Sequence, residues 1–496
     1  MPLASAVAAL LAVASGASAR NVVSFDLTRG PPGLSLDPSP PGLSRRGIHS
    51  HVLINNITGG AYYARAAVGT PPQPVSLIID SGSSDTWVVS NRADLCTTRR
   101  LQQYYADSCS ATYDSSKSST HKVVDKDGFE IRYLDGGSAA GDYVTDDFTI
   151  GDVTIKSLQI GHARQTIRSV GILGVGFSSN EVAKNKYPNI IDQLYRQGFI
   201  DSKAFSLYLN DRRSDTGNIL FGGVDKDKFV GALEVIDMLT VKGNPKPVSF
   251  EIPFTAMSLT YNNGSSVPIS TTKSDDAVLA AVLDSGTTLS YLPDFVAQQI
   301  YAALGAVSDT RRDGTGLSFV SCDYLRPGQE FYLTLGFGDT AKIVVPVSEL
   351  VLDNLEGYED IIPRGLPFTD VCMLGIHTTS DFESSGTVRS GNFALVGETF
   401  LRSAYVVYDL SHYQIGIAQA NMNSTKTSIV HLYAADNGLP GLMGLGKPKS
   451  PIPEPTLGDI NNQPGDSAGA GAKAMSRHVV SGLLAIATLS CFFFAV

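Results

Sequence analysis

Two short segments of this 496-residue chain carry the same arrangement of an acidic residue, a turn and hydroxyl groups. Residues 77–84 read LIIDSGSS, and residues 281–288 read AVLDSGTT. In each segment an apolar run typical of a buried strand ends at an aspartate, Asp80 or Asp284, and a Ser-Gly turn follows. One Asp-Ser-Gly triplet can arise in an ordinary turn. Two triplets in matching surroundings indicate an internal duplication.

The repeat extends beyond the two aspartates. An aromatic residue follows each motif, at Trp87 and at Tyr291. Further along, GILG at 171–174 and ALVG at 394–397 both place two apolar residues before a glycine. Such a glycine would let a strand pass close beneath each aspartate loop. The repeated unit is therefore a strand, an aspartate loop and a second strand that supports the loop.

Two such halves, related by a pseudo-twofold axis, would bring Asp80 and Asp284 together. Carboxylates about 3 Å apart do not both ionise readily, so the pair shares one proton. One carboxyl group can then act as a base toward water while the other donates a proton to a carbonyl oxygen. This chemistry predicts hydrolysis of amide bonds at acidic pH, with no covalent intermediate, metal or cofactor. No GxSxG motif or Cys-His constellation in the sequence competes with it.

The elements that must position the pair are mostly strands. Residues from about 61 to 419 form short apolar runs separated by Gly, Asn, Asp and Pro. Strands are expected at 75–79, 217–222 and 404–409, and helices at 190–197 and 294–304.

We therefore expect a mostly β fold with two lobes related by a pseudo-twofold axis. The N-terminal lobe would cover residues 47–230 and carry Asp80, and the C-terminal lobe would cover residues 231–430 and carry Asp284.

The first 46 residues predict export and processing. Residues 3–19 are apolar and end in Ala-Ser-Ala, which is typical of a signal peptide cleaved after Ala19. The run is shorter than the roughly 20 apolar residues that cross a bilayer. Residues 20–46 are interpreted as a pro-segment, because they are rich in Pro and Gly, cannot bury enough apolar surface to fold alone, and end in Arg45-Arg46. The alternative is a chance basic pair.

The C-terminal end predicts a lipid anchor. Residues 431–478 would form a linker and spacer that includes a run of small residues at 465–471, and residues 479–496 are apolar. This order is typical of a glycosylphosphatidylinositol (GPI) signal, whose tail is removed when the anchor is attached. Ser467 is the expected attachment residue, since it leaves a spacer of about 9 residues. The alternative is a true C-terminal membrane helix. The expected location is the cell surface, at the plasma membrane or in the cell wall.

The remaining composition fits a secreted protein. Removal of the tail would leave four cysteines, which in a secreted chain imply two disulfides with three possible connectivities. Pairing within each half closes the shortest loops, and no CxxC motif suggests a metal site. Sequons for glycosylation begin at Asn56, Asn263 and Asn423. The net charge of -10 argues against a nucleic acid partner, because phosphate binding needs clustered Lys and Arg.

With these motifs the chain resembles the pepsin-like aspartic proteases over nearly all of its body. It looks most similar to the fungal surface-anchored group, the yapsins and candidapepsin-type enzymes. The resemblance implies a monomeric bilobal fold with a cleft that binds a peptide in extended form. Asp80 and Asp284 match the catalytic pair. Matching support residues are Ser81 and Ser285, which cross-brace the loops, Ser83 and Thr287, which hydrogen-bond the carboxylates, and Trp87, which packs behind the flap.

The resemblance also places a mobile flap over the cleft at residues 131–138, which read IRYLDGGS. Its Gly-rich tip suits a lid that excludes water. Tyr133 matches the flap tyrosine, but the glycine that usually follows is replaced by Leu134. Residues expected to contact substrate are Gly82, Tyr133, Asp135, Gly136 and Gly286.

The same resemblance implies the disulfides Cys96–Cys109 and Cys322–Cys372. Arg99-Arg100, inside the first loop, is either an exposed basic pair or a second processing site. The alternatives from other classes of function are a catalytically inactive pepsin-like binding module and a structural wall glycoprotein. The first would be favoured by loss of an aspartate or the flap tyrosine, and the second by long Ser/Thr repeats. Yapsin-like relatives tend to prefer basic residues in substrates, which is compatible with the acidic charge of this chain.

Overall fold

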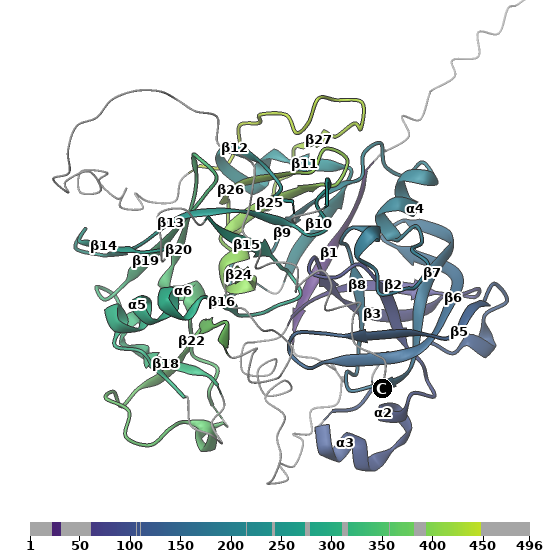
Figure 1. Cartoon of the computed structure of the whole chain (residues 1–496), viewed down its shortest axis with the longest axis horizontal. Coiled ribbons are helices and arrows are strands. Elements are labelled where there is room, and N and C mark those ends of the chain that lie inside the picture. Colours follow the sequence, from purple (N-terminus) through teal and green to yellow (C-terminus); the bar gives the residue numbers. More distant parts are fainter. Residues whose placement is uncertain are drawn as a thin grey trace, which may run out of the picture.

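The computed structural model describes residues 22–30, 61–105, 107–109, 111–214, 216–240, 244–272, 278–309, 316–356, 358–380 and 393–447. Strands dominate these ranges, so the predicted mostly β class is confirmed. Two lobes lie side by side, with the N-terminal half in blue and the C-terminal half in green (Figure 1). The expected helices are present as α4 (Ile190–Arg196) and α5 (Asp294–Leu304).

The N-terminal lobe is built on a hairpin and a set of curved strands. Its strands are β2 (Ala61–Val68), β3 (Gln73–Asp80), β4 (Thr86–Val89), β5 (Lys122–Arg132), β6 (Ser138–Ile150), β7 (Val153–Thr166) and β8 (Gly171–Gly174). Short helices lie between them: α2 (Asp94–Thr97), α3 (Arg99–Tyr105), η1 (Ser115–Lys117) and η2 (Ser178–Asn180).

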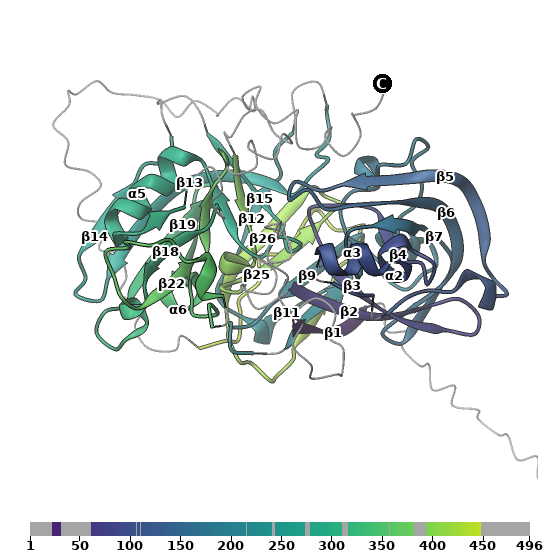
Figure 2. The same cartoon turned by 90° about the horizontal axis from the view of Figure 1, so that it is seen from below.

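A sheet of 13 strands continues from this lobe into the middle of the molecule, in the order β12-β26-β25-β9-β10-β1-β2-β3-β8-β4-β7-β6-β5. Figure 2 shows β9, β25 and β26 between the two lobes. The remaining strands of the 13-stranded sheet are β1 (Val23–Gly30), β9 (Ala204–Tyr208), β10 (Thr216–Phe221), β12 (Phe229–Asp237), β25 (Ala404–Asp409) and β26 (Gln414–Ala420). A separate two-stranded sheet pairs β11 (Gly223–Asp225) with β27 (Ile429–His431), and η3 spans Lys226–Lys228.

The C-terminal lobe contains a sheet of eight strands and a smaller sheet of four. The larger sheet consists of β13 (Glu251–Tyr261), β14 (Ser266–Ile269), β15 (Leu279–Leu283), β16 (Ser290–Leu292), β19 (Phe331–Phe337), β20 (Ala341–Pro346), β23 (Ile376–Thr378) and β24 (Phe393–Val396). The smaller sheet consists of β17 (Val307–Ser308), β18 (Ser318–Ser321), β21 (Val351–Leu352) and β22 (Val371–Leu374). The helices are α5, α6 (Val347–Leu350), α8 (Glu398–Leu401), η4 (Cys322–Leu325) and η5 (Glu359–Ile361).

The strand pairings repeat in the two lobes as the duplicated motifs predict. β3, which leads to Asp80, pairs in parallel with β8, and β15, which leads to Asp284, pairs in parallel with β24. The glycine that ends each supporting pattern touches backbone. A Cβ on Gly174 would lie 2.7 Å from the Asp85 carbonyl oxygen, and one on Gly397 would lie 2.1 Å from that of Leu289. Contacts this close explain why glycine is needed at both positions.

Strand β1 comes from the predicted pro-segment. It pairs with β10 on one side and β2 on the other, and its Val23 and Leu27 are fully buried. A stretch that cannot fold alone therefore becomes ordered by adding a strand between two existing ones. Arg29 of β1 donates a hydrogen bond to the carbonyl of Arg212, so a polar contact also ties this strand to the body.

The C-terminal part of the body extends past the expected boundary at 430. Leu432 and Leu439 are buried in an apolar cluster, and residues 442–446 hydrogen-bond the segment 226–233 at the edge of the large sheet. Within the described residues no helix has the length and hydrophobicity needed to cross a bilayer. Outside the described residues lie the predicted signal peptide, the pair Arg45-Arg46, the sequon at Asn56 and the anchor signal with Ser467.

Candidate active site

The two aspartate loops meet between the lobes and brace each other. The Ser81 hydroxyl donates to the Leu283 carbonyl over 2.9 Å, and the Ser285 hydroxyl donates to the Ile79 carbonyl over 3.1 Å. The hydroxyls also accept from backbone: the Ser285 N–H reaches Ser81 Oγ at 2.9 Å, and the Ser81 N–H reaches Ser285 Oγ at 3.2 Å. Four reciprocal hydrogen bonds between buried groups thus hold the two loops at a fixed separation.

The Asp80 carboxylate is held from its own loop. Asp80 Oδ1 accepts the Gly82 N–H at 2.8 Å, and Asp80 Oδ2 accepts the hydroxyl of Ser83. The Asp284 carboxylate has the equivalent contacts, from the Gly286 N–H at 2.8 Å and from the Thr287 hydroxyl at 2.6 Å.

One further contact crosses the axis, since the Gly82 N–H also reaches Asp284 Oδ1 at 3.1 Å. Asp284 Oδ1 therefore accepts hydrogen bonds from both loops.

Glycines let the two loops come this close. A Cβ on Gly286 would lie 2.4 Å from Asp80 Oδ1, and a Cβ on Gly82 would lie 2.7 Å from Asp284 Oδ1. Both separations are shorter than a van der Waals contact, so any side chain at either position would push one carboxylate away from the other.

The electrostatics favour one shared proton. The side chains of Asp80 and Asp284 are almost completely buried and lie within hydrogen-bonding reach of each other. Burial raises the pKa of Asp80 to about 7, and the negative charge of Asp284 adds to the shift. At acidic pH Asp80 therefore keeps its proton next to Asp284. One carboxyl group is then available as an acid and the other as a base.

The predicted flap is the turn between β5 and β6. The Tyr133 N–H donates to the Gly137 carbonyl at 2.8 Å, and Gly136 has a positive φ of 83°, which explains the glycine at the tip. The Trp87 indole donates to the Tyr133 hydroxyl at 2.7 Å. Leu134 packs against an apolar cluster of the C-terminal lobe that includes Leu289 and Tyr291. The residue that departs from the expected glycine thus joins the flap tip to the opposite lobe.

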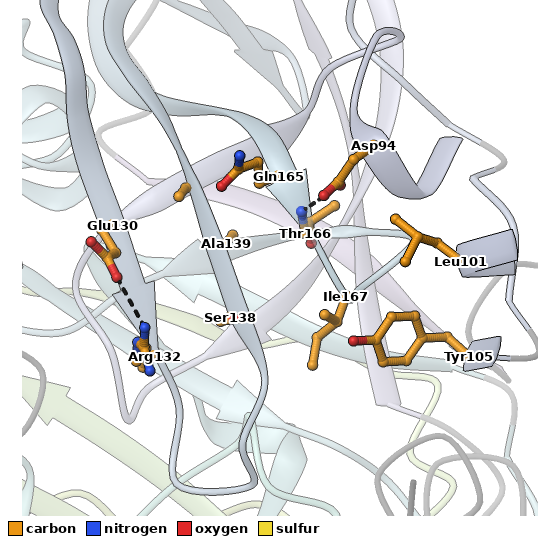
Figure 3. Close-up of a pocket in the computed structure, with 11 residues that line it drawn as sticks. Asp94, Leu101, Tyr105, Glu130, Arg132, Ser138, Ala139, Gln165, Thr166 and Ile167 are labelled. Carbon is orange, nitrogen blue, oxygen red and sulfur yellow. Dashed lines mark hydrogen bonds and ion pairs between the residues drawn. The ribbon is translucent and has the colours of Figure 1, made fainter. Parts of the chain in front are cut away.

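A pocket of about 240 Å³ lies on the outer face of the flap hairpin (Figure 3). Helix α3 covers it with Leu101 and Tyr105, and Asp94 of α2 accepts the Thr166 N–H at 2.9 Å. The Cys96–Cys109 disulfide joins α2 to the segment that follows α3. This disulfide-linked segment therefore lies against β7, the strand that pairs with β6 of the flap hairpin.

The sequence patterns missed two buried groups close to the site. Asp85 accepts hydrogen bonds from the hydroxyls of Tyr143 and Tyr187, at 2.7 and 2.9 Å, and from the Val182 N–H at 2.7 Å. Arg168 pairs with Asp135 of the flap at 2.6 Å. A buried acid directly after the Asp-Ser-Gly-Ser-Ser run was a readable signal for Asp85. No motif pointed to Arg168.

The other predicted residues belong to other parts of the structure than the two aspartate loops. Both predicted disulfides are present, Cys96–Cys109 and Cys322–Cys372. Asn263 and Asn423 are exposed, as acceptors of a glycan must be, and Arg99 and Arg100 are exposed on α3. Within the described ranges, no three potential metal ligands gather in one place. The catalytic, binding and glycosylation roles of these residues remain predictions.

Comparison with known proteins settles the family. Residues 61–420 match the model of the eukaryotic aspartyl protease family. This chain belongs to that family. The matched range contains both aspartate loops and the flap, so the pepsin-like resemblance is confirmed.

Fungal relatives match the protease over most of its length. A probable aspartic-type endopeptidase, opsB, of Aspergillus oryzae is 34% identical over 458 residues, which cover 87% of this chain and 86% of the relative. Candidapepsin of Candida tropicalis is 33% identical, over 75% of this chain and 82% of the relative. Aspartic proteinase 3 of Saccharomyces cerevisiae is 28% identical, over 78% of this chain and 74% of the relative. The protein is an aspartic-type endopeptidase.

Proposed function

We propose that this protease cleaves peptide bonds at acidic pH with a water molecule held between Asp80 and Asp284. The observation that carries the proposal is the pair itself: two buried carboxyl groups in cross-braced loops, with the pKa of Asp80 raised to about 7 by burial and by the charge of Asp284. Asp80 is then the acid and Asp284 the base.

The chemistry proceeds in two steps. Asp284 takes a proton from the water as its oxygen attacks the carbonyl carbon, and Asp80 gives its proton to the carbonyl oxygen. In the tetrahedral product, the bond between carbon and nitrogen breaks as the nitrogen receives the proton from Asp284. Asp80 recovers a proton from one hydroxyl as the carboxylic acid forms. The products are an acid and an amine, and the two carboxyl groups return to their starting states.

This mechanism fixes the alkaline side of the pH profile. Asp80 can donate only while protonated, so activity should decline as the pH rises through about 7. We expect kcat/KM on a reporter peptide to fall by about tenfold per pH unit above that point. A rate that stays constant or rises between pH 6 and pH 9 would rule out Asp80 as the acid.

We further propose that the protease reaches the cell surface through the secretory pathway and is held there by a lipid anchor. The apolar ends of the sequence support this, and the two disulfides fit an oxidising compartment. Treatment of intact cells with a phosphatidylinositol-specific phospholipase C should release the active enzyme. A chain ending at residue 447, the last described residue, should appear in the medium without treatment. Retention of the full chain in the membrane fraction after lipase treatment would support a membrane helix instead.

A further inference from the structure

Arg168 touches three parts of the flap tip. Its Nη2 lies 2.6 Å from Asp135 Oδ2, and its guanidinium carbon lies 5.0 Å from the centre of the Tyr133 ring. Gly137 passes so close that a Cβ there would lie 2.6 Å from Arg168 Nε. A single cation therefore contacts the aromatic ring, the acid and the backbone of the turn.

The pair formed by Arg168 and Asp135 lies close to the catalytic centre. Burial raises the pKa of Tyr133 well above its usual value, and the charge of Asp80 adds to this shift. Burial tends to lower the pKa of Arg168, but Asp135, Tyr133 and Asp80 together raise it above its usual value. The Arg168 side chain is only 10% exposed. Among the residues that the structure describes, its Nε has no hydrogen-bond partner.

This placement matters for any peptide that lies between the flap and the catalytic pair. Because Arg168 lies over the Tyr133 ring and pairs with Asp135, a substrate side chain beside this ring would lie near both charges. A Lys or Arg side chain would approach the guanidinium, and a Glu side chain would approach the Asp135 carboxylate. Each would bring like charges together in a partly desolvated space. An uncharged side chain meets neither penalty and can pack on the Tyr133 ring and on the apolar stem of Arg168.

We propose that Arg168 positions the flap tip and sets substrate specificity, by balancing Asp135 so that the subsite beneath Tyr133 accepts uncharged side chains and excludes charged ones. The inference rests on the proposed function in one respect, namely that substrate lies between the flap and Asp80.

Charge-changing variants test this directly. Peptides that differ at one position, with norleucine, Lys or Glu at each of the four positions around the scissile bond, are cleaved at pH 5.5, where carboxylates of ordinary pKa are ionised. The wild type should favour norleucine at one of these positions. In Arg168→Gln the negative charge of Asp135 is no longer balanced by Arg168, so the kcat/KM ratio of Lys to norleucine at that position should rise about tenfold.

Removal of the negative charge at Asp135, alone or together with the positive charge at Arg168, completes the test. Asp135→Asn should raise the kcat/KM ratio of Glu to norleucine by a similar factor. In the double variant both charges are removed, so neither the Lys ratio nor the Glu ratio should rise above the other. Arg164→Gln is the matched control, because Arg164 pairs with Asp127 and Asp142 on the same sheet and should leave both ratios unchanged. If neither single variant moves a ratio by more than about twofold at any position, the specificity role is wrong.

The positioning role has its own measurement. Arg168→Lys keeps the charge but loses the planar group that stacks on Tyr133 and reaches Asp135. This variant should keep the wild-type charge preference while its KM rises several-fold, and an unchanged KM would refute the positioning role. Should Arg168→Gln fail to fold, the Lys variant and Asp135→Asn still decide the question. Cleavage of the norleucine peptide by wild type, and its loss in Asp80→Asn, tests the proposed function separately.

Discussion

The two aspartate loops have the same core and different surroundings. In both, a Ser braces the opposite loop, a Gly N–H and a hydroxyl hold the carboxylate, and a parallel strand supports the turn. Directly after the hydroxyl pair, the loops diverge. Asp85 binds two tyrosines and a backbone N–H, whereas the corresponding Leu289 lies in an apolar cluster.

Because of this difference, the residue after the hydroxyl pair has a different role in each lobe. The polar network of Asp85 stabilises the lobe that carries the flap, and the apolar cluster around Leu289 provides the surface on which Leu134 of the flap tip rests. The groups that hydrogen-bond the two carboxylates are equivalent in the two lobes, because both aspartate loops meet at one axis. The groups behind them differ because only one half carries the flap.

Substitutions in the part that the two aspartate loops share should reduce activity most. Gly286→Ala would place a Cβ 2.4 Å from Asp80 Oδ1, so one carboxylate must move. We expect kcat/KM on a peptide to fall at least a hundredfold, since small displacements of catalytic groups are costly. Gly441→Ala, where an added Cβ meets nothing within 4 Å, is the control. Activity within tenfold of wild type in Gly286→Ala would show that the separation of the carboxylates is not tightly set.

The divergent residues should differ in how they stabilise the fold. Asp85→Ala leaves two hydroxyls and one N–H without their acceptor, and each buried donor costs about 1–3 kcal/mol. We expect the free energy of unfolding to fall by about 3–5 kcal/mol. Leu289→Ala should cost about 2–4 kcal/mol through the cavity it opens. Urea denaturation measures both, and a loss below 1 kcal/mol in Asp85→Ala would show that the network is not stabilising.

The contact between flap and opposite lobe should affect substrate binding more than chemistry. Leu134→Gly removes the side chain that packs on the C-terminal cluster, so the closed flap is less favoured. We expect KM to rise about fivefold with a smaller change in kcat. Leu134→Met, which keeps the apolar contact, should stay close to wild type. An unchanged KM in the glycine variant would mean that this contact does not hold the flap.

The smallest expected effect is on thermal stability at higher pH. Burial raises the pKa of Glu398 to about 8, of Glu181 to about 9 and of Glu251 to about 7. Each holds its proton more tightly in the folded chain than in the unfolded one, so stability is lost as the pH rises toward these values. We expect Tm to fall by several degrees between pH 6.5 and pH 8.5. Glu398→Gln should make the decline shallower, and a Tm that rises over this range would contradict the assignment.

Local patterns were enough to predict the two aspartate loops, because the repeated motif and its supporting strand each lie within a short segment. The disulfide pairing was implied by the family resemblance, since Cys322 and Cys372 are 50 residues apart. Long-range pairings were not predictable. Strand β1 finds its partner β10 about 190 residues along the chain, and nothing in a Pro-rich segment indicates that pairing. Arg168 and Asp135 are 33 residues apart and meet only because β6 pairs with β7, which brings the segment after β7 beside the flap turn. Leu134 could be seen as unusual, but its partner lies in the other lobe.

The most direct test replaces each aspartate of the pair in turn. Asp80→Asn and Asp284→Asn keep the size of the side chain and remove its ability to exchange a proton. Cleavage of one peptide at acidic pH should fall at least a thousandfold in each variant, while both variants unfold cooperatively near the wild-type temperature. Either variant retaining more than about a tenth of the wild-type kcat/KM would contradict a mechanism in which both carboxyl groups act on the same water.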